Sequence, residues 1–333
     1  MVTSEVQKQL FAHIKNNLPA HLSMVDQLCD LLGVSADSIY RRMRGEKPVS
    51  LQELKIICQK YQVSLDGLLQ LNTNTVVFKA SDLHRKDFSF IEILTNMQQQ
   101  LTLMNSFTNK QMWYLCKDMP FWQFYFYDEL GAFKSFFWAK TIHNAPEYAG
   151  KKFSLQGIDF AEHINIGKQC ARLYNNFPSI ELWNVESINS TLSQIQFYID
   201  SDGFAKDSDV HAVIDALDAT IDHLQLQAEK GCKFMPGAKD VSYGAALDFY
   251  VNEVIIGSNT IVAELDGSRI AFIPYNVFSF LQTRDTTFTS SIFRSMDNLR
   301  TKSTLVSGTG EKERNRFFKK MKTQVALLRE RKG

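Results

Sequence analysis

The stretch MVDQLCDLLGVSADSIYRRMRG, residues 24–45, decides the fold of the first part of the chain. In MVDQLCDLLG the apolar residues recur at helical spacing on one face, Ser23 is a favoured N-cap, and Gly33 suits a helix end. A second helix can be capped by Ser35, and it stops at Gly45. The stretch therefore predicts two short helices joined by a tight turn.

The second of these helices has two faces of different character. Ile39 and Met43 lie together on a helical wheel, while the opposite side is polar and basic. A recognition helix needs this arrangement, because the apolar stripe docks it on a scaffold while outward side chains enter the major groove of DNA. Apolar residues at helical spacing continue through 51–69. We therefore expect five helices around one small core.

In order and spacing, this segment resembles the lambda-repressor/Cro-like family, which is also called the XRE family. The resemblance rests on LGVS at 32–35, SIYRRMRG at 38–45, the proline of the following loop and QVSLDGLL at 62–69. It covers about 65 of the 333 residues. The resemblance implies binding to double-stranded DNA, and it implies paired half-sites that a homodimer reads.

The family pattern also implies which side chains contact DNA. The residues at its base-contacting positions are Ala36, Asp37, Ser38 and Arg41. Arg44 and Lys47 stand at phosphate-contacting positions, and Tyr40 suits either role. The other interpretation is a helix-turn-helix that contacts protein, with its arginines forming a solvated face.

Arg42 departs from the family pattern, which usually has an apolar residue at that position. On the wheel it borders the buried stripe, so we expect its stem to pack and its guanidinium to reach outward. We therefore include Arg42 among the candidate DNA-binding residues.

Charge is unevenly distributed along the chain. Residues 1–70 hold eight Lys/Arg and seven Asp/Glu, a net charge of +1, whereas residues 311–333 hold nine and three, a net charge of +6. The net charge of +1 predicts modest sequence-independent affinity for DNA, so specific contacts or dimerisation must contribute. Residues 71–310 carry −6 and are a poor candidate for a nucleic-acid surface.

The basic segment at 313–332, ERNRFFKKMKTQVALLRERK, contains an apolar stripe at helical spacing. Such a pattern is typical of a docked amphipathic helix with a solvated basic face. A second DNA contact and a partner-binding arm remain alternatives for this segment.

Length predicts more than one domain. The divisions that we expect are a helix-turn-helix domain at 1–71, a linker at 72–87, a helical domain at 88–240, and an α+β region at 241–333. Runs rich in β-formers, FYVNEVII, TIVAEL and RIAFIPY, predict a small three-stranded antiparallel meander in the last region. Helices are expected around 277–282 and 287–301. The predicted fold class is mainly α.

Residues 113–138 hold twelve aromatic side chains. Charged residues interrupt the segment, which argues against a membrane span. The favoured interpretation is hydrophobic core, and a ligand pocket or a dimer surface are the alternatives.

Other kinds of site find little support in the sequence. Five scattered cysteines predict neither a disulfide framework nor a metal site, and no catalytic or cofactor-binding motif is convincing. Four residues at helical spacing could bind a metal, although a solvated helix edge is the favoured interpretation: His211, Asp215, Asp218 and Asp222. No window approaches about 18 apolar residues, so we expect a cytoplasmic protein without membrane contact.

These observations predict a sequence-specific transcriptional regulator, not an enzyme. We expect a dimer on a palindromic operator, with recognition helices about 34 Å apart, and repression is one plausible outcome. The C-terminal part would serve dimerisation, with an unidentified effector as a further option. The alternatives are an autoregulated enzyme or defence effector and a protein–protein adaptor.

Overall fold

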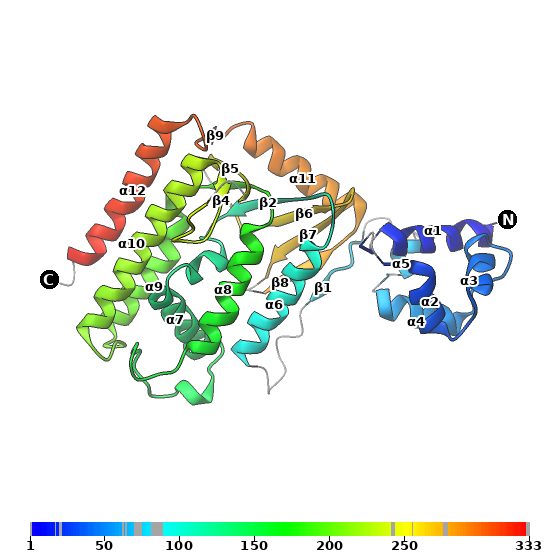
Figure 1. Ribbon diagram of the computed structural model, residues 1–333, viewed down its shortest axis with the longest axis horizontal. Helices are drawn as coiled ribbons and strands as arrows, with labels where there is room; N and C mark the ends of the chain where they lie inside the picture. The colour runs from blue at the N-terminus through cyan, green and yellow to red at the C-terminus, as the bar shows by residue number, and fades with distance from the viewer. Residues whose placement is uncertain are drawn as a thin grey trace.

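The computed structural model describes residues 2–16, 18–19, 22–61, 63, 65–69, 75–80, 89–240, 244–254, 256–275 and 279–330. They form a small helical lobe, residues 2–69, and a large lobe built on a sheet, residues 75–330 (Figure 1). Most of the expected linker at 72–87 lies outside the described residues. Its described part, 75–80, belongs to the large lobe, because it ends in a strand of the sheet.

The small lobe contains the five expected helices. They are α1 (Val2–Asn16), α2 (Met24–Leu32), α3 (Ala36–Met43), α4 (Leu51–Tyr61) and α5 (Leu65–Leu69). The hydroxyl of Ser23 accepts a hydrogen bond from the N–H of Asp26, and Gly33 ends α2 at a φ of 64°. Glycine adopts this left-handed conformation without steric cost. Leu10, Ile39 and other apolar side chains form a separate core.

The large lobe corrects the predicted fold class, because it is α/β rather than mainly α. Within the described residues, the sheet has nine strands in the order β1-β8-β7-β6-β2-β3-β5-β4, and β9 pairs with β5. The parallel strands at its centre are β2 (Lys110–Cys116), β3 (Ser179–Trp183) and β5 (Ala245–Val251). The antiparallel strands are β6 (Ile261–Leu265), β7 (Ser268–Pro274), β8 (Phe280–Thr283), β1 (Lys79–Ala80), β4 (Cys232–Lys233) and β9 (Thr304–Leu305).

Three specific expectations for this part of the chain are wrong. Strands β2 and β3 lie in the region expected to be all-helical, and they share one sheet with β5 to β8. The antiparallel meander consists of β6, β7 and β8, since β5 pairs with β3 in parallel and lies apart from β6. The described part of the helix expected at 277–282 is strand β8, whereas residues 277–278 lie outside the described residues.

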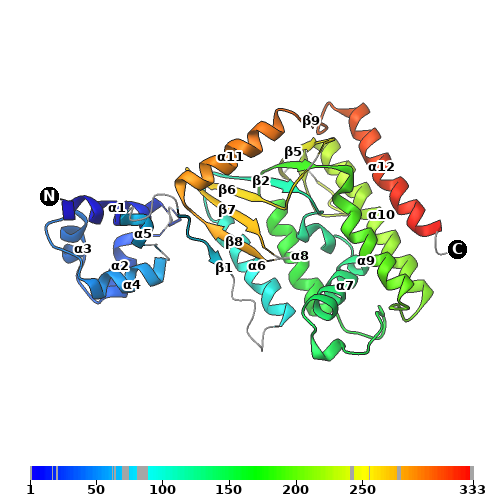
Figure 2. The same cartoon turned by 180° about the vertical axis from the view of Figure 1, so that it is seen from behind.

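Helices cover the two faces of the sheet unequally. On one face, side chains of six helices share a core with β2, β3 and β5. These helices are α6 (Phe90–Asn105), α7 (Asp128–Phe137), α8 (Ala161–Asn175), α9 (Asn189–Asp200), α10 (Asp207–Lys230) and α12 (Glu311–Glu330). On the other face, α11 (Thr286–Arg300) packs on β6 and β7. Figure 2 shows α11 running along the sheet toward β9.

The aromatic segment is core, as the favoured interpretation predicts. Ten of its twelve aromatic side chains are buried: Trp113, Tyr114, Trp122, Phe124, Tyr125, Phe126, Phe133, Phe136, Phe137 and Trp138. The ring of Tyr125 lies against Gly167 of α8, where a Cβ atom would come within 2.1 Å of it. A close helix approach of this kind requires glycine.

Among the described residues, no helix combines the length and the apolar character that crossing a membrane requires.

Candidate nucleic-acid interface

Helix α3, which the sequence predicts to be the recognition helix, is held by its buried side. Ile39 is fully buried in the small core, and the Ser35 hydroxyl accepts a hydrogen bond from the N–H of Ser38 at 3.4 Å. An N-cap of this type satisfies one of the unpaired N–H groups of the first turn. The helix therefore has a fixed start and a fixed rotation about its axis.

Gln7 of α1 connects the first helix to the segment that follows α3. Its Nε2 donates to the carbonyl oxygens of Arg42 at 2.6 Å and Lys47 at 2.8 Å, and its Oε1 accepts from the N–H of Val49 at 2.9 Å. The side chain is buried, so the three hydrogen bonds compensate the loss of hydration. Gln7 thereby holds the loop that carries Lys47.

Arg42 is the main departure from expectation in this region. Its side chain is 4% exposed, and its guanidinium donates to Glu53 of α4 and to the carbonyl oxygen and hydroxyl of Ser38. The guanidinium therefore turns inward instead of reaching outward. A charged group can be buried in this way because it is paired and hydrogen-bonded. Arg42 positions α3 against α4.

Glu53 has a second role at the start of α4. Its Oε2 accepts from the N–H of Ser50, whose hydroxyl accepts from the N–H of Glu53. Burial by itself raises the pKa of the Glu53 carboxyl, but hydrogen bonds from Ser50 and Arg42 outweigh this effect and lower the pKa. Glu53 is thus an ionised partner for Arg42.

The remaining candidate residues form the outward side of α3 and the loop after it. The exposed members are Ala36, Asp37, Tyr40, Arg41, Arg44 and Lys47. Ser38 is half-buried, and its hydroxyl is engaged by Arg42 and, at 3.5 Å, by the ammonium group of Lys47. The structure thus brings seven of the eight candidate side chains to one surface, and it separates Arg42 from them.

Glu46 lies beside the two exposed arginines. It accepts two hydrogen bonds from Arg44, at 2.6 and 3.0 Å, and its carboxylate lies 3.8 Å from the guanidinium of Arg41. The hydrogen bond from Arg44 lowers the pKa of Glu46 and raises that of Arg44. A carboxylate at this place competes with a phosphate for the same guanidinium groups.

Sequence reasoning missed Gln7, Glu46 and Glu53. The pattern Ser50-x-x-Glu53 is a capping-box signal that would have located the start of α4. No local signal identifies Gln7, because its partners lie 35 to 42 residues away in the chain.

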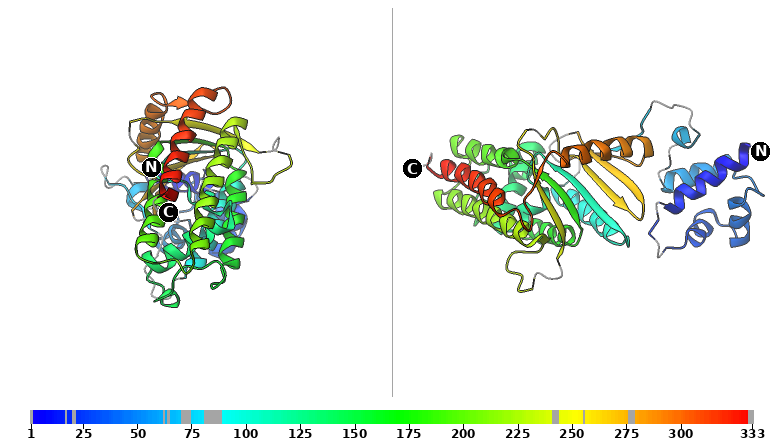
Figure 3. Two further views of the ribbon diagram at one scale, coloured as in Figure 1. Left: turned by 90° about the vertical axis from the view of Figure 1, so that its left-hand side faces the viewer. Right: turned by 90° about the horizontal axis from the view of Figure 1, so that it is seen from above.

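The basic C-terminal helix α12 packs against α10, and the two lie side by side in Figure 3. Lys322 is ion-paired with Asp222 at 2.7 Å, and Arg329 is ion-paired with Asp215 at 2.6 Å. The apolar stripe of α12 is buried in the large core. These contacts confirm the docked amphipathic helix. The described residues contain no cluster that could hold a metal ion, and the aspartates proposed for one pair with cations instead.

Comparison with known families supports the nature of the small lobe. A family model described as the BetR domain, an N-terminal helix-turn-helix DNA-binding domain of transcriptional regulators, matches residues 5–84. The match covers about a quarter of the chain, and it extends past α5 to include β1. No curated protein and no solved structure matches the chain. The match thus describes the small lobe and its connection to the sheet.

Proposed function

We propose that this chain is a sequence-specific transcriptional regulator that binds a palindromic operator as a homodimer. The observation that carries the proposal is the outward surface of α3, which stands on a buried scaffold inside a segment similar to the BetR domain. In the XRE-like arrangement, Arg41 contacts a base edge while Arg44 and Lys47 contact phosphates. The large lobe serves dimerisation and effector sensing, without an enzymatic reaction, and the outcome is repression.

The junction of the two lobes supports a sensing role. Strand β1 pairs with β8, the hydroxyl of Thr283 donates to the carbonyl oxygen of Val77 at 2.8 Å, and the ring of Phe78 packs edge-on against Phe288 of α11. The chain that leaves the small lobe is therefore attached to both the sheet edge and α11. A shift of α11 would move this attachment.

The other end of α11 lies near the ends of the parallel strands. Arg300 donates to the hydroxyl of Tyr250 in β5 at 3.3 Å, and Asn252 donates to the hydroxyl of Ser303 at 3.1 Å. Helix α11 thus contacts the strand ends of the sheet at one end and, at the other end, the segment that connects the small lobe to the sheet. Such an element can carry a conformational difference between two sites.

Selection of DNA from a random pool with the purified full-length protein tests the proposal. We expect a palindromic motif whose half-sites are about one helical turn apart. Light scattering should give the mass of a dimer. If the selected pool shows no enrichment over random DNA, the proposal is wrong.

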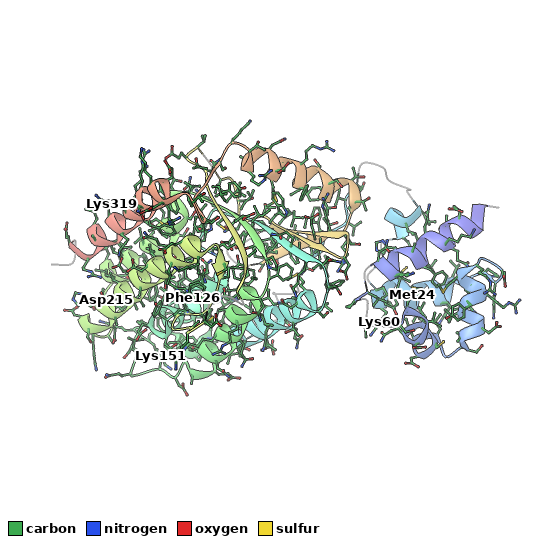
Figure 4. All side chains as sticks on the ribbon, turned by 45° about the horizontal axis from the view of Figure 1, so that its top comes forward. Met24, Lys60, Phe126, Lys151, Asp215 and Lys319 are labelled. Carbon is green, nitrogen blue, oxygen red and sulfur yellow. The ribbon has the colours of Figure 1, made fainter. Side chains whose placement is uncertain are left out.

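A variant pair sharpens the assay. Arg41→Ala should abolish the base preference at one position of the selected motif. Lys319→Ala, on the exposed side of α12 (Figure 4), should leave the motif unchanged. Equal effects of the two substitutions would indicate that charge, not the surface of α3, determines binding.

A further inference from the structure

A cavity of about 260 Å³ lies at the carboxyl ends of the parallel strands β3 and β5. Its wall is formed by residues that follow these strands, by Thr304 of β9 and by one side of α12. In open α/β sheets, ligands bind outside the carboxyl ends of parallel strands. The cavity thus lies at the edge of the sheet that is formed by the carboxyl ends of its parallel strands.

Two buried asparagines form the polar part of the cavity. Asn252 is 3% exposed, and its N–H donates to the carbonyl oxygen of Trp183 at 2.8 Å, which joins the two strand ends. Asn184 is 7% exposed, and its Oδ1 accepts from the N–H of Glu186. Within the described part of the chain, the Nδ2 of Asn184 donates to no group. The Nδ2 of Asn184 is not a fully buried atom, so it is accessible from the cavity and can donate to a bound acceptor.

The charged groups around the cavity are not fully paired with each other. Lys320 lies 3.9 Å from Glu253, so these two side chains form a weak ion pair. Arg316 and Glu313, on the same side of α12, make no ion pair within the described residues. The cavity is therefore lined by a guanidinium and a carboxylate without an ion-pair partner, both on exposed side chains, and by the amide of Asn184.

We propose that this cavity binds a small zwitterion, a free α-amino acid. Its carboxylate would be held by Arg316 and the amide of Asn184, and its ammonium group by Glu313. Val185, Val251 and Phe317 supply an apolar wall for the side chain of the ligand. The volume falls just below the roughly 300–1,000 Å³ that is usual for drug-sized ligands, which favours a ligand of this size over a nucleotide.

A simple anion is a poorer fit, because Glu313 and Glu253 would repel it. An amine without a carboxylate would leave Arg316 and the Asn184 amide without an acceptor. An amino acid carries both groups, so its carboxylate can accept from Arg316 and Asn184 while its ammonium group pairs with Glu313.

The inference names an effector for the proposed function, and it rests on that function for its regulatory meaning. Occupancy would act on Asn252 and Thr304, which flank the start of β9 and the end of α11. The binding test, however, is independent of DNA.

Calorimetry with the full chain and each of the twenty standard L-amino acids tests the site, with acetate, methylamine and inorganic phosphate as separate probes. We expect at least one amino acid to bind much more tightly than the three probes. Arg316→Gln and Glu313→Gln should each weaken its binding by roughly tenfold, because each removes one charge-assisted contact. The matched controls are Lys319→Gln and Glu311→Gln, which change exposed charges of α12 outside the cavity and should bind normally.

The inference is wrong if no amino acid binds, if phosphate binds as tightly as the amino acid, or if the cavity variants bind like the controls. Selection of DNA without any ligand reports on the proposed function separately. A DNA motif without amino-acid binding would therefore overturn only the site. Amino-acid binding that leaves the DNA affinity unchanged would support the site and contradict the sensing role.

Discussion

The two lobes hold positive charge in different ways. In the small lobe, Arg41 and Arg44 stay at the surface beside a single carboxylate, Glu46, whereas the buried Arg42 has a carboxylate partner. In the large lobe, surface cations of α12 pair with the acidic helix α10. Net charge along the sequence therefore does not show which cations are paired. In the +6 segment, Lys320, Lys322 and Arg329 form ion pairs within the large lobe, whereas Arg41 and Arg44 of the weakly charged lobe are exposed beside Glu46.

The large lobe also buries cations without a carboxylate in ion-pair contact. Lys134 donates to Gln194 at 2.6 Å and lies 4.0 Å from the ring centre of Phe124, and Lys233 lies 3.6 Å from the ring centre of Tyr174. Burial lowers the pKa of each lysine to about 7. The stability of the small lobe should therefore depend on the ion pair of Arg42, whereas the stability of the large lobe should depend on pH through Lys134 and Lys233.

The largest effect is expected from Arg42→Ala. It leaves Glu53 unpaired and partly buried, so the small lobe should lose about 3–5 kcal/mol of unfolding free energy. Hydrogen exchange of α3 and α4 in the full chain measures the loss. The double variant Arg42→Met with Glu53→Gln should recover part of the stability. An unchanged exchange rate in Arg42→Ala would contradict the structural role of this arginine.

Arg41→Ala should weaken binding to the selected DNA by about 1–3 kcal/mol and relax one base position. Lys47→Ala should instead weaken binding to all sequences alike, because it would remove the proposed phosphate contact. Fluorescence anisotropy with the selected and a scrambled duplex separates the two effects. Lys322→Ala is the control, since its charge is already paired with Asp222. A loss in Lys322→Ala as large as that in Arg41→Ala would break the contrast between α3 and α12.

The stability of the large lobe should rise with pH above neutrality. Because the folded pKa of Lys134 is depressed, the unfolded chain binds more protons than the folded chain between pH 7 and the ordinary lysine pKa of about 10.4. The gain is at most about 1.4 kcal/mol per pH unit for each such lysine. Denaturant unfolding between pH 7 and 8.5, followed by the fluorescence of the four tryptophans, reads only this lobe.

The variant Lys134→Met should show a smaller slope with pH than the unmodified protein. Lys140→Met, which removes a half-buried lysine whose ammonium group donates to the carbonyl oxygen of Lys151, should keep the slope. Equal slopes in all three proteins would show that the buried lysine does not titrate in this range.

The smallest effect is expected from Glu46→Gln. If phosphates of DNA bind Arg44 and Arg41, Glu46 competes with them, so its neutralisation should tighten binding to every DNA sequence by roughly a few-fold at low salt. The gain should shrink as salt is raised, since exposed charges are screened. Asp26→Gln changes another exposed carboxylate of the small lobe and should have no such effect. Weaker binding by Glu46→Gln would mean that this carboxylate orients the arginines for DNA.

The small lobe could be predicted from sequence because its signals are local. Ser23, Gly33 and Ser35 mark helix ends, and the periodicity of Leu28 and Ile39 marks the buried side. The side chain of Arg42 could not be placed in the same way, because its partner Glu53 is on another helix, eleven residues away. Its pairing requires the tertiary structure.

The sheet could not be predicted because its central pairings are non-local. Strands β2 and β3 are mostly buried, so MWYLC and SIELW contain no clear alternation of polar and apolar residues. Their register joins Met112 to Ser179, which are 67 residues apart, across α7 and α8. The cavity was missed for the same reason, since Asn184, Asn252 and Arg316 meet only when the sheet and α12 are assembled.

The attachment of β1 to the sheet limits the operators that a dimer could bridge. Helix α5 ends at Leu69, and after it the first described residue that is hydrogen-bonded to the large lobe is Val77, whose carbonyl oxygen accepts from Thr283. Eight residues of chain span at most roughly 26–29 Å. If the large lobes of two copies form the dimer, this short connecting segment limits how far each small lobe can move from its large lobe. Insertion of a few base pairs between the half-sites should therefore abolish binding, because the two small lobes could no longer reach both half-sites.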